Sequence, residues 1–484
     1  MWCDAGVLES QLPDPAGAQM AAARDEAHHG PSWRGPRRGT ALCLSGGGFR
    51  AALFHLGALR RLNELGMLGQ LRTVSAVSGG SIPAMLLADP RLEWPSAHDL
   101  SESIDSADEV EADPSAPPLP IPGPVPGGLF SAQRVRGFEE YVAEPLYRLT
   151  RHNLRTRALV AGWGPRLGRR SDASARRLAD QLVEHIPWWA AEMRSGQRAS
   201  GPAIVVEATE LAHGVNWTFA DARAHPPHGR VGDYRLGYGD PPPGLRMADV
   251  VASSSAYPPY FAPFDLDARG LELSGGKVGQ MDPTAGARLQ HTIQLLDGGI
   301  YDNLALEPVW REHAGVLVSD GGAVFRARSA RTPFGRILHV ISIAAGGGEV
   351  TRLRWLHSAF NWGVLEGATW AMDSRVPQSY PVEVAARINQ VRTDMDAFTA
   401  DEQKILERHG YGVADSAIRR HAPQLILRDA PAQYPHPEVA DPEVALQALR
   451  RSGRVSLLGR SSGTGPERRA ARRRRGGRPG RGRA

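Results

Sequence analysis

Two short β-prone runs, each ending in glycines and followed by a helical pattern, constrain the fold more than any other feature of the sequence. The first run occupies residues 41–44 and ends in three consecutive glycines, after which leucines recur at helical spacing. The second occupies residues 73–77 and ends at Ser78 and two glycines, before an apolar stretch over residues 82–87. Consecutive strand–turn–helix units are typical of parallel strands covered by helices. We therefore predict an α/β fold with a central, mostly parallel sheet flanked by helices.

The later part of the chain adds strands and a helical segment. Residues 134–197 carry leucines at helical spacing, which predicts a helical insertion between the Ser78 turn and the later strands. Residues 353–370 combine aromatic and apolar side chains, which indicates an amphipathic helix over the sheet or, alternatively, a helix at a lipid interface. Short apolar runs predict further strands at residues 203–209, 250–255, 292–296, 316–318 and 337–343.

Composition changes along the chain and divides it into three parts. Residues 1–38 are polar and rich in Ala, Gly, Pro and His, and we predict a flexible leader there. Residues 39–435 contain the strand and helix patterns of the folded domain, with an acidic and then proline-rich insertion near residues 89–128. Residues 436–484 have no regular pattern and are predicted to be an irregular segment with an arginine-rich tail.

The basic charge of the chain is concentrated in that tail. The formal net charge is +5, but residues 467–484 hold nine Arg and one Glu, a net +8, which leaves −3 for the rest. Such a tail can contact anionic lipid or nucleic acid, although a solvated end is the commoner reading of this composition. We therefore predict no specific nucleic-acid partner.

Cysteine usage and hydropathy bear on the compartment. The two cysteines, Cys3 and Cys43, do not make a disulfide framework. The N-terminus lacks the basic start and apolar stretch of a secretory signal, and no uninterrupted apolar run approaches the roughly 18 residues that span a membrane. We expect a cytoplasmic protein whose contact with membranes is peripheral at most.

The segment around Ser78 has the composition of a nucleophile turn. Ester hydrolysis by serine requires an exposed hydroxyl, a base that takes its proton, and donors for the developing oxyanion. Residues 76–80 resemble the Gly-x-Ser-x-Gly turn that presents a serine between a strand and a helix, with Ala76 in place of the first glycine. Because a strand is predicted before this turn and a helix after it, we predict that Ser78 is the nucleophile.

The earlier glycine turn supplies donors for an anion. Consecutive glycines at a helix N-terminus let backbone N–H groups converge on an oxyanion or a phosphate. This turn lacks the Gly-Lys-Ser/Thr ending of a P-loop and the spaced glycines of a dinucleotide fingerprint, so nucleotide binding is not expected. The candidate oxyanion-hole residues are Gly46, Gly47, Gly48 and Gly79.

Together these motifs resemble the patatin-like phospholipase family, which has a glycine-rich oxyanion segment with a following arginine, a serine turn, and an Asp-Gly-Gly or Asp-Gly-Ala motif in this order. Here the three motifs are residues 46–50, 76–80 and 297–299. The resemblance extends over residues 41–304 and includes residues 252–258, which are similar to the small-residue segment before the family's aspartate. It implies a patatin-like catalytic domain in which a Ser–Asp dyad replaces a Ser-His-Asp triad.

Asp297 is the base that this resemblance implies. It ends a β-prone run and is followed by Tyr301, Asp302 and Asn303, as the family's aspartate often is, whereas the competing Asp-Gly-Gly at Asp320 lies one strand later. An aspartate at its reference pKa of about 3.9 is a weak base for a serine hydroxyl, so a poorly solvated site is expected to raise its pKa.

Arg50 follows the glycine turn and completes the predicted site. It either positions the turn or meets an anionic headgroup, and we favour the positioning role because one arginine is a weak signal for phosphate binding. No His, Cys and carboxylate cluster has metal-ligand spacing, so neither a metal nor another cofactor is expected.

The implied function is that of a serine esterase in lipid metabolism, which cleaves carboxylic esters of lipids, and the family points to phospholipids. An acyltransferase shares the acyl-enzyme and differs in the acceptor. A catalytically inactive lipid-binding or scaffold protein is suggested by Ala76 and by the unusual tail. The remaining alternative is an α/β-hydrolase with a late histidine, for which the candidates are His313, His339 and His357.

Overall fold

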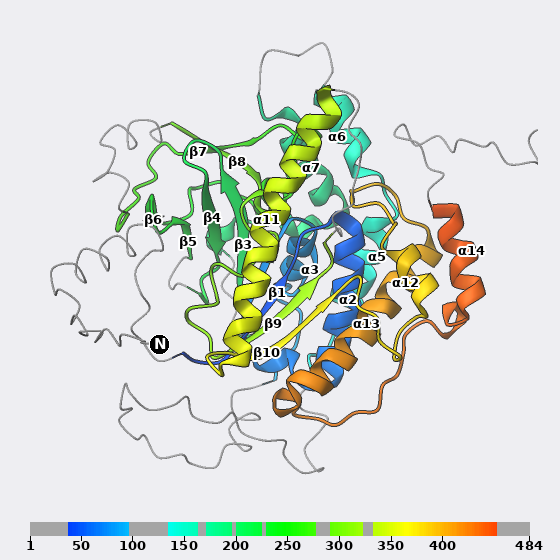
Figure 1. Ribbon diagram of the computed structural model, residues 1–484. Coiled ribbons are helices and arrows are strands. Elements are labelled where there is room, and N and C mark those ends of the chain that lie inside the picture. Colours follow the sequence, from blue (N-terminus) through cyan, green and yellow to red (C-terminus); the bar gives the residue numbers. More distant parts are fainter. Residues whose placement is uncertain are drawn as a thin grey trace, which may run out of the picture.

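The computed structural model of the chain describes residues 37–95, 134–162, 171–195, 200–224, 229–276, 291–322 and 333–452. Most of the predicted leader, most of the acidic and proline-rich insertion, and the arginine-rich tail lie outside these residues. The elements are labelled in Figure 1.

The described strands form one ten-stranded sheet in the order β10-β9-β1-β2-β3-β4-β5-β6, to which β8 and β7 are added beside β3. The parallel strands are β10 (Glu366–Ala371), β9 (Gly315–Asp320), β1 (Thr40–Leu44), β2 (Leu71–Val77) and β3 (Ala203–Glu210). The antiparallel ones are β4 (Val215–Ala220), β5 (Arg230–Asp233), β6 (Gly237–Gly239), β7 (Phe264–Asp267) and β8 (Thr292–Asp297).

Strand β3 brings the ends of β2 and β8 together. The last residue of β2, Val77, lies opposite Glu207, and the last residue of β8, Asp297, lies opposite Ala208, the next residue of β3. Strand β4 occupies the other edge of β3 along this stretch, so β2 and β8 share one edge and meet end to end. The residues that follow β2 are therefore placed next to Asp297.

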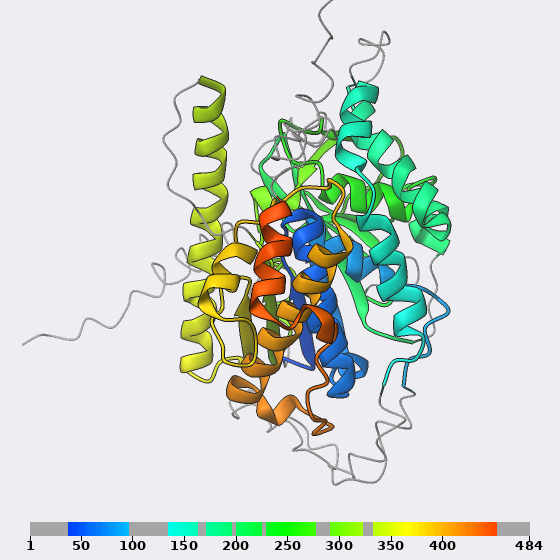
Figure 2. The same ribbon diagram turned by 90° about the vertical axis from the view of Figure 1, so that its right-hand side faces the viewer.

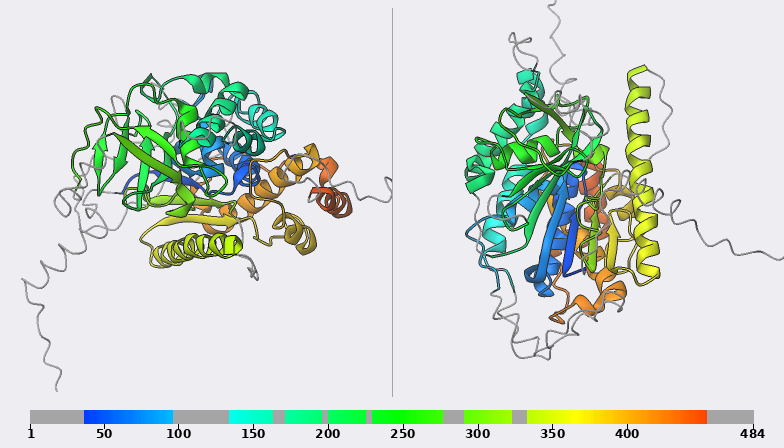
Figure 3. Two further views of the ribbon diagram at one scale, coloured as in Figure 1. Left: turned by 90° about the horizontal axis from the view of Figure 1, so that it is seen from above. Right: turned by 90° about the vertical axis from the view of Figure 1, so that its left-hand side faces the viewer.

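Helices cover both faces of the sheet (Figure 3). The long helix α11 (Pro333–Asn361) lies on one face. The larger helical layer on the other side contains α2 (Gly48–Glu64), α3 (Ser81–Leu86), α5 (Glu144–Thr150), α6 (Leu154–Gly162), α7 (Ala173–His185), α8 (Met247–Ser254) and α13 (Ala400–His421), with α12 (Val382–Ile388) and α14 (Pro442–Ser452) at its margin.

Strand β1 shows how the sheet is buried on both sides. Leu42 and Leu44 belong to the main core, whereas Ala41 and Cys43 belong to a second core that also contains Leu356 of α11. Alternate residues of a strand point to opposite faces, so a strand covered on both faces reads as a continuous apolar run. The sheet, its parallel strands and its helical layers confirm the predicted fold class.

The main helical layer is tightly packed where α2 crosses α13. A Cβ atom added at Gly57 would lie 1.9 Å from the carbonyl oxygen of Glu407, and one at Gly410 would lie 2.0 Å from that of Phe54. Glycine at both positions lets the two helix backbones touch. This contact fixes α2, which begins at Gly48 of the candidate site and has Gly47 as its N-cap.

Several predicted elements differ from the structure. Residues 250–255 and 337–343, predicted as strands, lie mainly in α8 and in α11. The aromatic stretch over residues 353–370 was predicted as one helix, but it contains the end of α11 and then strand β10. Helix α14 falls in the segment predicted to be irregular, whereas α5, α6 and α7 occupy the predicted helical insertion. Within the described part of the chain, no helix is both long enough and apolar enough to cross a bilayer.

Candidate active site

Ser78 lies in the tight turn between β2 and α3, in the 3-10 helix Ser78–Gly80. Its φ of +50° is a left-handed conformation that residues with a side chain rarely adopt, and backbone strain of this kind is concentrated at functional sites. A Cβ atom at Gly79 would lie 2.2 Å from the carbonyl oxygen of Gly48, and one at Gly80 would lie 2.3 Å from that of Leu44. The two glycines therefore let the Ser78 turn pack directly against the end of β1 and the start of α2.

Ala76, the departure from the Gly-x-Ser-x-Gly pattern, does not crowd this turn. It is an interior residue of β2, paired with Leu44 on one side and Val206 on the other. Its methyl group is fully buried in the main core. The backbone leaves the extended conformation only at Ser78, two residues later, so the alanine fits without disturbing the serine.

Asp297 accepts a hydrogen bond from the hydroxyl of Ser78. The distance from Ser78 Oγ to Asp297 Oδ2 is 2.6 Å, and the other carboxylate oxygen, Oδ1, accepts from the backbone N–H of Gly299 at 2.8 Å. The carbonyl oxygen of Asp297 accepts from the hydroxyl of Thr209 at 3.0 Å. Both carboxylate oxygens and the backbone of Asp297 are thus held in place.

The small-residue segment at residues 252–258 packs between these two residues. Ser254, at the end of α8, accepts a hydrogen bond through Oγ from the backbone N–H of Ser78 at 2.8 Å. The carbonyl oxygen of Ala256 accepts from the backbone N–H of Asp297 at 3.1 Å. One short segment therefore contacts the backbones of both Ser78 and Asp297.

Burial gives Asp297 the properties of a base. Desolvation raises its pKa to about 6, against the opposing effect of the hydrogen bonds from Ser78 and Gly299, which stabilise the charged carboxylate. At neutral pH the group is mostly ionised, yet it binds a proton more readily than a solvated aspartate. A base poised near the working pH suits proton abstraction from a serine hydroxyl.

The glycine turn at residues 46–48 faces Ser78. Gly47 and Gly48 have φ angles of +138° and +61°, which favour glycine, and Gly48 begins α2, where the first N–H groups have no partner within the helix. Gly46 has a different position. Its N–H donates to the carbonyl oxygen of Asn303 at 3.0 Å, and a Cβ atom there would lie 3.2 Å from that of Ser78.

The donor set of the predicted oxyanion hole is therefore narrower than the sequence indicated. Because the N–H of Gly46 is already bonded, the prediction that Gly46 belongs to the donor set is wrong in this structure. Gly46 instead gives Ser78 and Asn303 room at the site. Gly47, Gly48 and Gly79 remain candidate donors.

The competing aspartate, Asp320, contacts the glycine turn and not Ser78. Its Oδ1 accepts from the hydroxyl of Ser45 at 3.3 Å and from the N–H of Gly322 at 2.8 Å. The geometry thus pairs Ser78 with Asp297 rather than with Asp320. Asp320 instead holds the segment that lies against Gly47, at which a Cβ atom would be 2.8 Å from the carbonyl oxygen of Gly321.

Arg50 is buried beneath the glycine turn. Its Nη2 donates to the carbonyl oxygens of Gly321 and Gly322 at 2.9 and 2.6 Å, and its Nη1 donates to that of Val391 at 3.2 Å. A side chain buried in this way does not reach a headgroup in solvent. The contacts support the positioning role that we favoured from the sequence.

A buried hydrogen-bonded chain that sequence reasoning missed also supports the turn. The carbonyl oxygen of Ser45 can only accept, so His55 donates to it from Nε2 at 3.0 Å, and His55 Nδ1 accepts from the hydroxyl of Ser319 at 2.7 Å. Ser319 in turn accepts from the indole N–H of Trp370 at 2.9 Å. Burial lowers the pKa of His55 to about 4, so the imidazole ring is neutral at neutral pH. A lone histidine in a helix gives no signal for this role.

Two histidines of the α/β-hydrolase alternative, His313 and His357, hydrogen-bond to groups other than Ser78. His313 is buried, with Nδ1 against the carbonyl oxygen of Val309 and Nε2 against the hydroxyl of Thr73, each at 2.9 Å. His357 contacts Thr369 at the far end of α11. Among the described residues, no group of three or more His, Cys, Asp or Glu side chains is arranged to hold a metal ion.

Comparisons with known proteins place the chain in a family. A human group IVD cytosolic phospholipase A2 structure is 13% identical, with a TM-score of 0.39, and the match covers 86% of this chain and 62% of that one. VipD from Legionella pneumophila is 14% identical, with a TM-score of 0.29, and the match covers 80% of this chain and 67% of that one. No curated protein sequence matches the chain. The family model for patatin-like phospholipases matches residues 42–310, more than half of the sequence, and the chain therefore belongs to the patatin-like phospholipase family.

Proposed function

We propose that the protein hydrolyses carboxylic esters of lipids with Ser78 as nucleophile and Asp297 as base. The observation that carries this proposal is the 2.6 Å hydrogen bond from the Ser78 hydroxyl to a buried carboxylate whose pKa is raised to about 6. Membership of the family supports a lipid substrate and, more narrowly, a phospholipid. Ala76, which had suggested an inactive protein, fits within β2 and gives no reason to assume inactivity.

The reaction proceeds through an acyl-enzyme. Asp297 takes the hydroxyl proton as Ser78 Oγ bonds to the ester carbonyl carbon, and the carbonyl oxygen becomes an oxyanion. The tetrahedral species collapses, the bond to the alcohol oxygen breaks, and the alcohol leaves with the proton from Asp297. Asp297 then takes a proton from water, the hydroxide attacks the acyl carbon, and Ser78 recovers its proton as the fatty acid departs.

The N–H groups of Gly47, Gly48 and Gly79 are the proposed oxyanion donors. The turn at Ser78 touches the first turn of α2, since a Cβ atom at Gly79 would lie 2.6 Å from the nitrogen of Gly48. Their N–H groups are therefore close together and close to Ser78. At the start of α2 the helix dipole adds a positive potential that favours the developing negative charge.

We further propose that the protein works in the cytoplasm and meets membranes peripherally, as expected from the sequence. We also propose the division into a leader, a catalytic domain over residues 39–435 and a C-terminal segment.

The experiment that tests the dyad measures hydrolysis of a short nitrophenyl ester and of mixed phospholipid vesicles. We expect Ser78→Ala to abolish both activities and Asp297→Asn to reduce them by about 10²- to 10⁴-fold, the usual contribution of a positioned base. Asp320→Asn is the matched control, because Asp320 is a partly buried aspartate at the end of a strand that also precedes two glycines, but it should keep most of the activity. Full activity in Asp297→Asn, with loss in Asp320→Asn, would assign the base to Asp320.

A further inference from the structure

The N-terminal half of α11 lies beside the candidate active site. Helix α11 is followed directly by β10, which is parallel to β9, so the start of the helix lies at the carboxyl ends of the parallel strands, where Ser78 also lies. Figure 2 shows α11 (yellow-green) at one side of the molecule, with this half extending beyond the orange and red helices of the C-terminal part.

The inner side of α11 is bound to the loops that surround Ser78 and Asp297. Ser342 hydrogen-bonds to the hydroxyl of Tyr257, whose neighbour Ala256 accepts from the backbone N–H of Asp297 at 3.1 Å. Two turns further along the helix, Glu349 accepts a hydrogen bond from the side-chain amide of Asn303 at 2.9 Å. These contacts are seven residues apart on the helix, so they define one face, and that face borders the approach to the site.

The opposite side of α11 presents an apolar stripe to solvent. Val340, Ile343 and Val350 are 64%, 51% and 45% exposed. An exposed arginine lies beyond each end of this group. Successive positions from one arginine to the other are separated alternately by four and three residues, which places all of them on one face of the helix. We call this set the outer stripe, and it consists of Arg336, Val340, Ile343, Gly347, Val350 and Arg354.

The outer stripe also lacks negative charge. Residues 337–348 contain no Asp, Glu, Lys or Arg, and the one acidic residue of α11, Glu349, points inward to Asn303. Helices that are apolar on every side are normally covered, either by protein or by lipid. Here the apolar side chains are exposed, and an arginine lies at each end of the stripe. This arrangement suits a lipid surface, in which apolar acyl chains lie beneath anionic headgroups.

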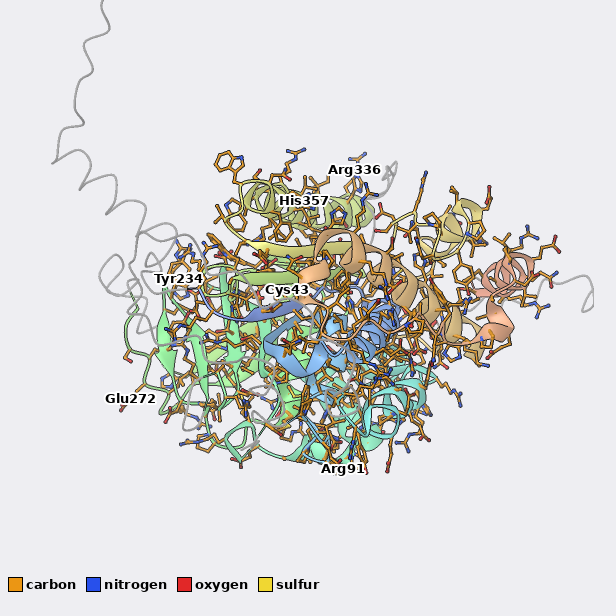
Figure 4. The ribbon with its side chains drawn as sticks, turned by 90° about the horizontal axis from the view of Figure 1, so that it is seen from below. Cys43, Arg91, Tyr234, Glu272, Arg336 and His357 are labelled. Carbon is orange, nitrogen blue, oxygen red and sulfur yellow. The ribbon has the colours of Figure 1, made fainter. Side chains whose placement is uncertain are left out.

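We propose that the outer stripe of α11 docks the protein on the surface of a lipid aggregate that contains anionic headgroups. This inference rests on the proposed function, because long-chain lipid esters are held in such aggregates, and α11 borders the site. The three apolar side chains enter the acyl region, while Arg336 and Arg354 contact the headgroups. Figure 4, in which Arg336 and His357 are labelled, shows α11 as the outermost element on its side of the molecule.

Vesicle flotation of the full chain tests the proposal. The Ser78→Ala protein serves as the parent, so that binding is measured without hydrolysis, on vesicles of phosphatidylcholine mixed with phosphatidylglycerol. Replacing Val340 and Ile343 by Gln should weaken the partition of this parent about tenfold or more, because two half-exposed aliphatic side chains no longer enter the lipid. Replacing Val382 and Val444 by Gln is the matched control, since these side chains are 49% and 47% exposed on other helices, and it should leave binding unchanged.

Three outcomes would overturn the docking proposal. The first is a parent that does not float, and the second is equal flotation of the V340Q/I343Q and parent proteins. The third is a dimeric parent that becomes monomeric in V340Q/I343Q, which would show that a second copy covers the stripe. Near-ultraviolet circular dichroism establishes that each variant is folded. Because the parent lacks Ser78, flotation and its loss are read independently of hydrolysis, so failure of the dyad proposal and failure of the docking proposal are distinguishable.

Discussion

Replacing Asp297 by Asn is expected to stabilise the protein while strongly reducing its activity. The carboxylate of Asp297 has a pKa of about 6 in the folded chain, against 3.8 when solvated. The folded state therefore binds the proton more tightly than the unfolded state, and stability falls as the pH rises from about 4 to about 6. A difference of about two pKa units corresponds to about 3 kcal/mol at neutral pH and above.

The effect has a defined dependence on pH. Linkage with these two pKa values gives a penalty of about 1.6 kcal/mol at pH 5 and about 3 kcal/mol at pH 8. Asparagine has no such penalty, although it also changes the hydrogen bonds to Ser78 and Gly299 by an amount that does not depend on pH. The stability of Asp297→Asn relative to the wild type should thus rise by about 1.4 kcal/mol between pH 5 and pH 8.

Urea unfolding at a series of pH values, followed by tryptophan fluorescence, measures this difference. Ser78→Ala is the informative control, because it removes a hydrogen bond that lowers the pKa of Asp297 and should move the transition to higher pH. The rate of ester hydrolysis by the wild type should rise through the same region, since Asp297 must be ionised to act as a base. A stability difference that stays constant from pH 5 to pH 8 would refute the raised pKa and, with it, the electrostatic basis of the dyad.

Two further predictions concern the packing that holds the site. Gly57→Ala should destabilise the protein by about 1–3 kcal/mol because its Cβ atom would meet the backbone of α13, whereas Gly347→Ala should stabilise it by about 0.5–1 kcal/mol because nothing lies within 4 Å of its Cβ position. Thermal unfolding distinguishes the two, and equal shifts would contradict the close helix crossing. Arg50→Met should cost about 2–4 kcal/mol, since it leaves the buried carbonyl groups of Gly321 and Gly322 without donors, and it should lower activity through the displaced glycine turn. Unchanged stability would contradict the positioning role.

The parts of the fold that could be predicted are those with strong local signals. The strands before Gly46 and Ser78 are short apolar runs ended by glycines, and they occur as β1 and β2. The runs at residues 250–255 and 337–343 have a similar composition but belong to helices, because a short apolar run does not distinguish a buried strand from a buried helix. At the start of α8, the carboxylate of Asp249 in the first turn accepts from the backbone N–H of Arg246 at 3.0 Å, and this contact begins the helix just before the run.

The residues of the candidate site can also be separated into those that local motifs predict and those that depend on tertiary contacts. Ser78 and Asp297 could be predicted from motifs, and the motif context favoured Asp297 over Asp320, although both precede two glycines. The contact of Asp297 with Ser78 depends on the pairing of β8 with β3, which is a tertiary contact that motifs do not give. His55 and the N–H of Gly46 could not be assigned for the same reason, because their partners lie far away in the sequence.

The alignment of β2 and β8 by β3 also determines which insertions and deletions this fold can tolerate. Ser78 and Asp297 are 219 residues apart, yet the ends of their strands are brought together by pairings with neighbouring residues of β3. Loops that do not contact the site can therefore lengthen at small entropic cost without moving either group. A one-residue deletion within β8, by contrast, would turn every later side chain of that strand to the opposite face of the sheet. The chain can thus change in length within the loops that connect these strands, but not within β2, β3 or β8 themselves.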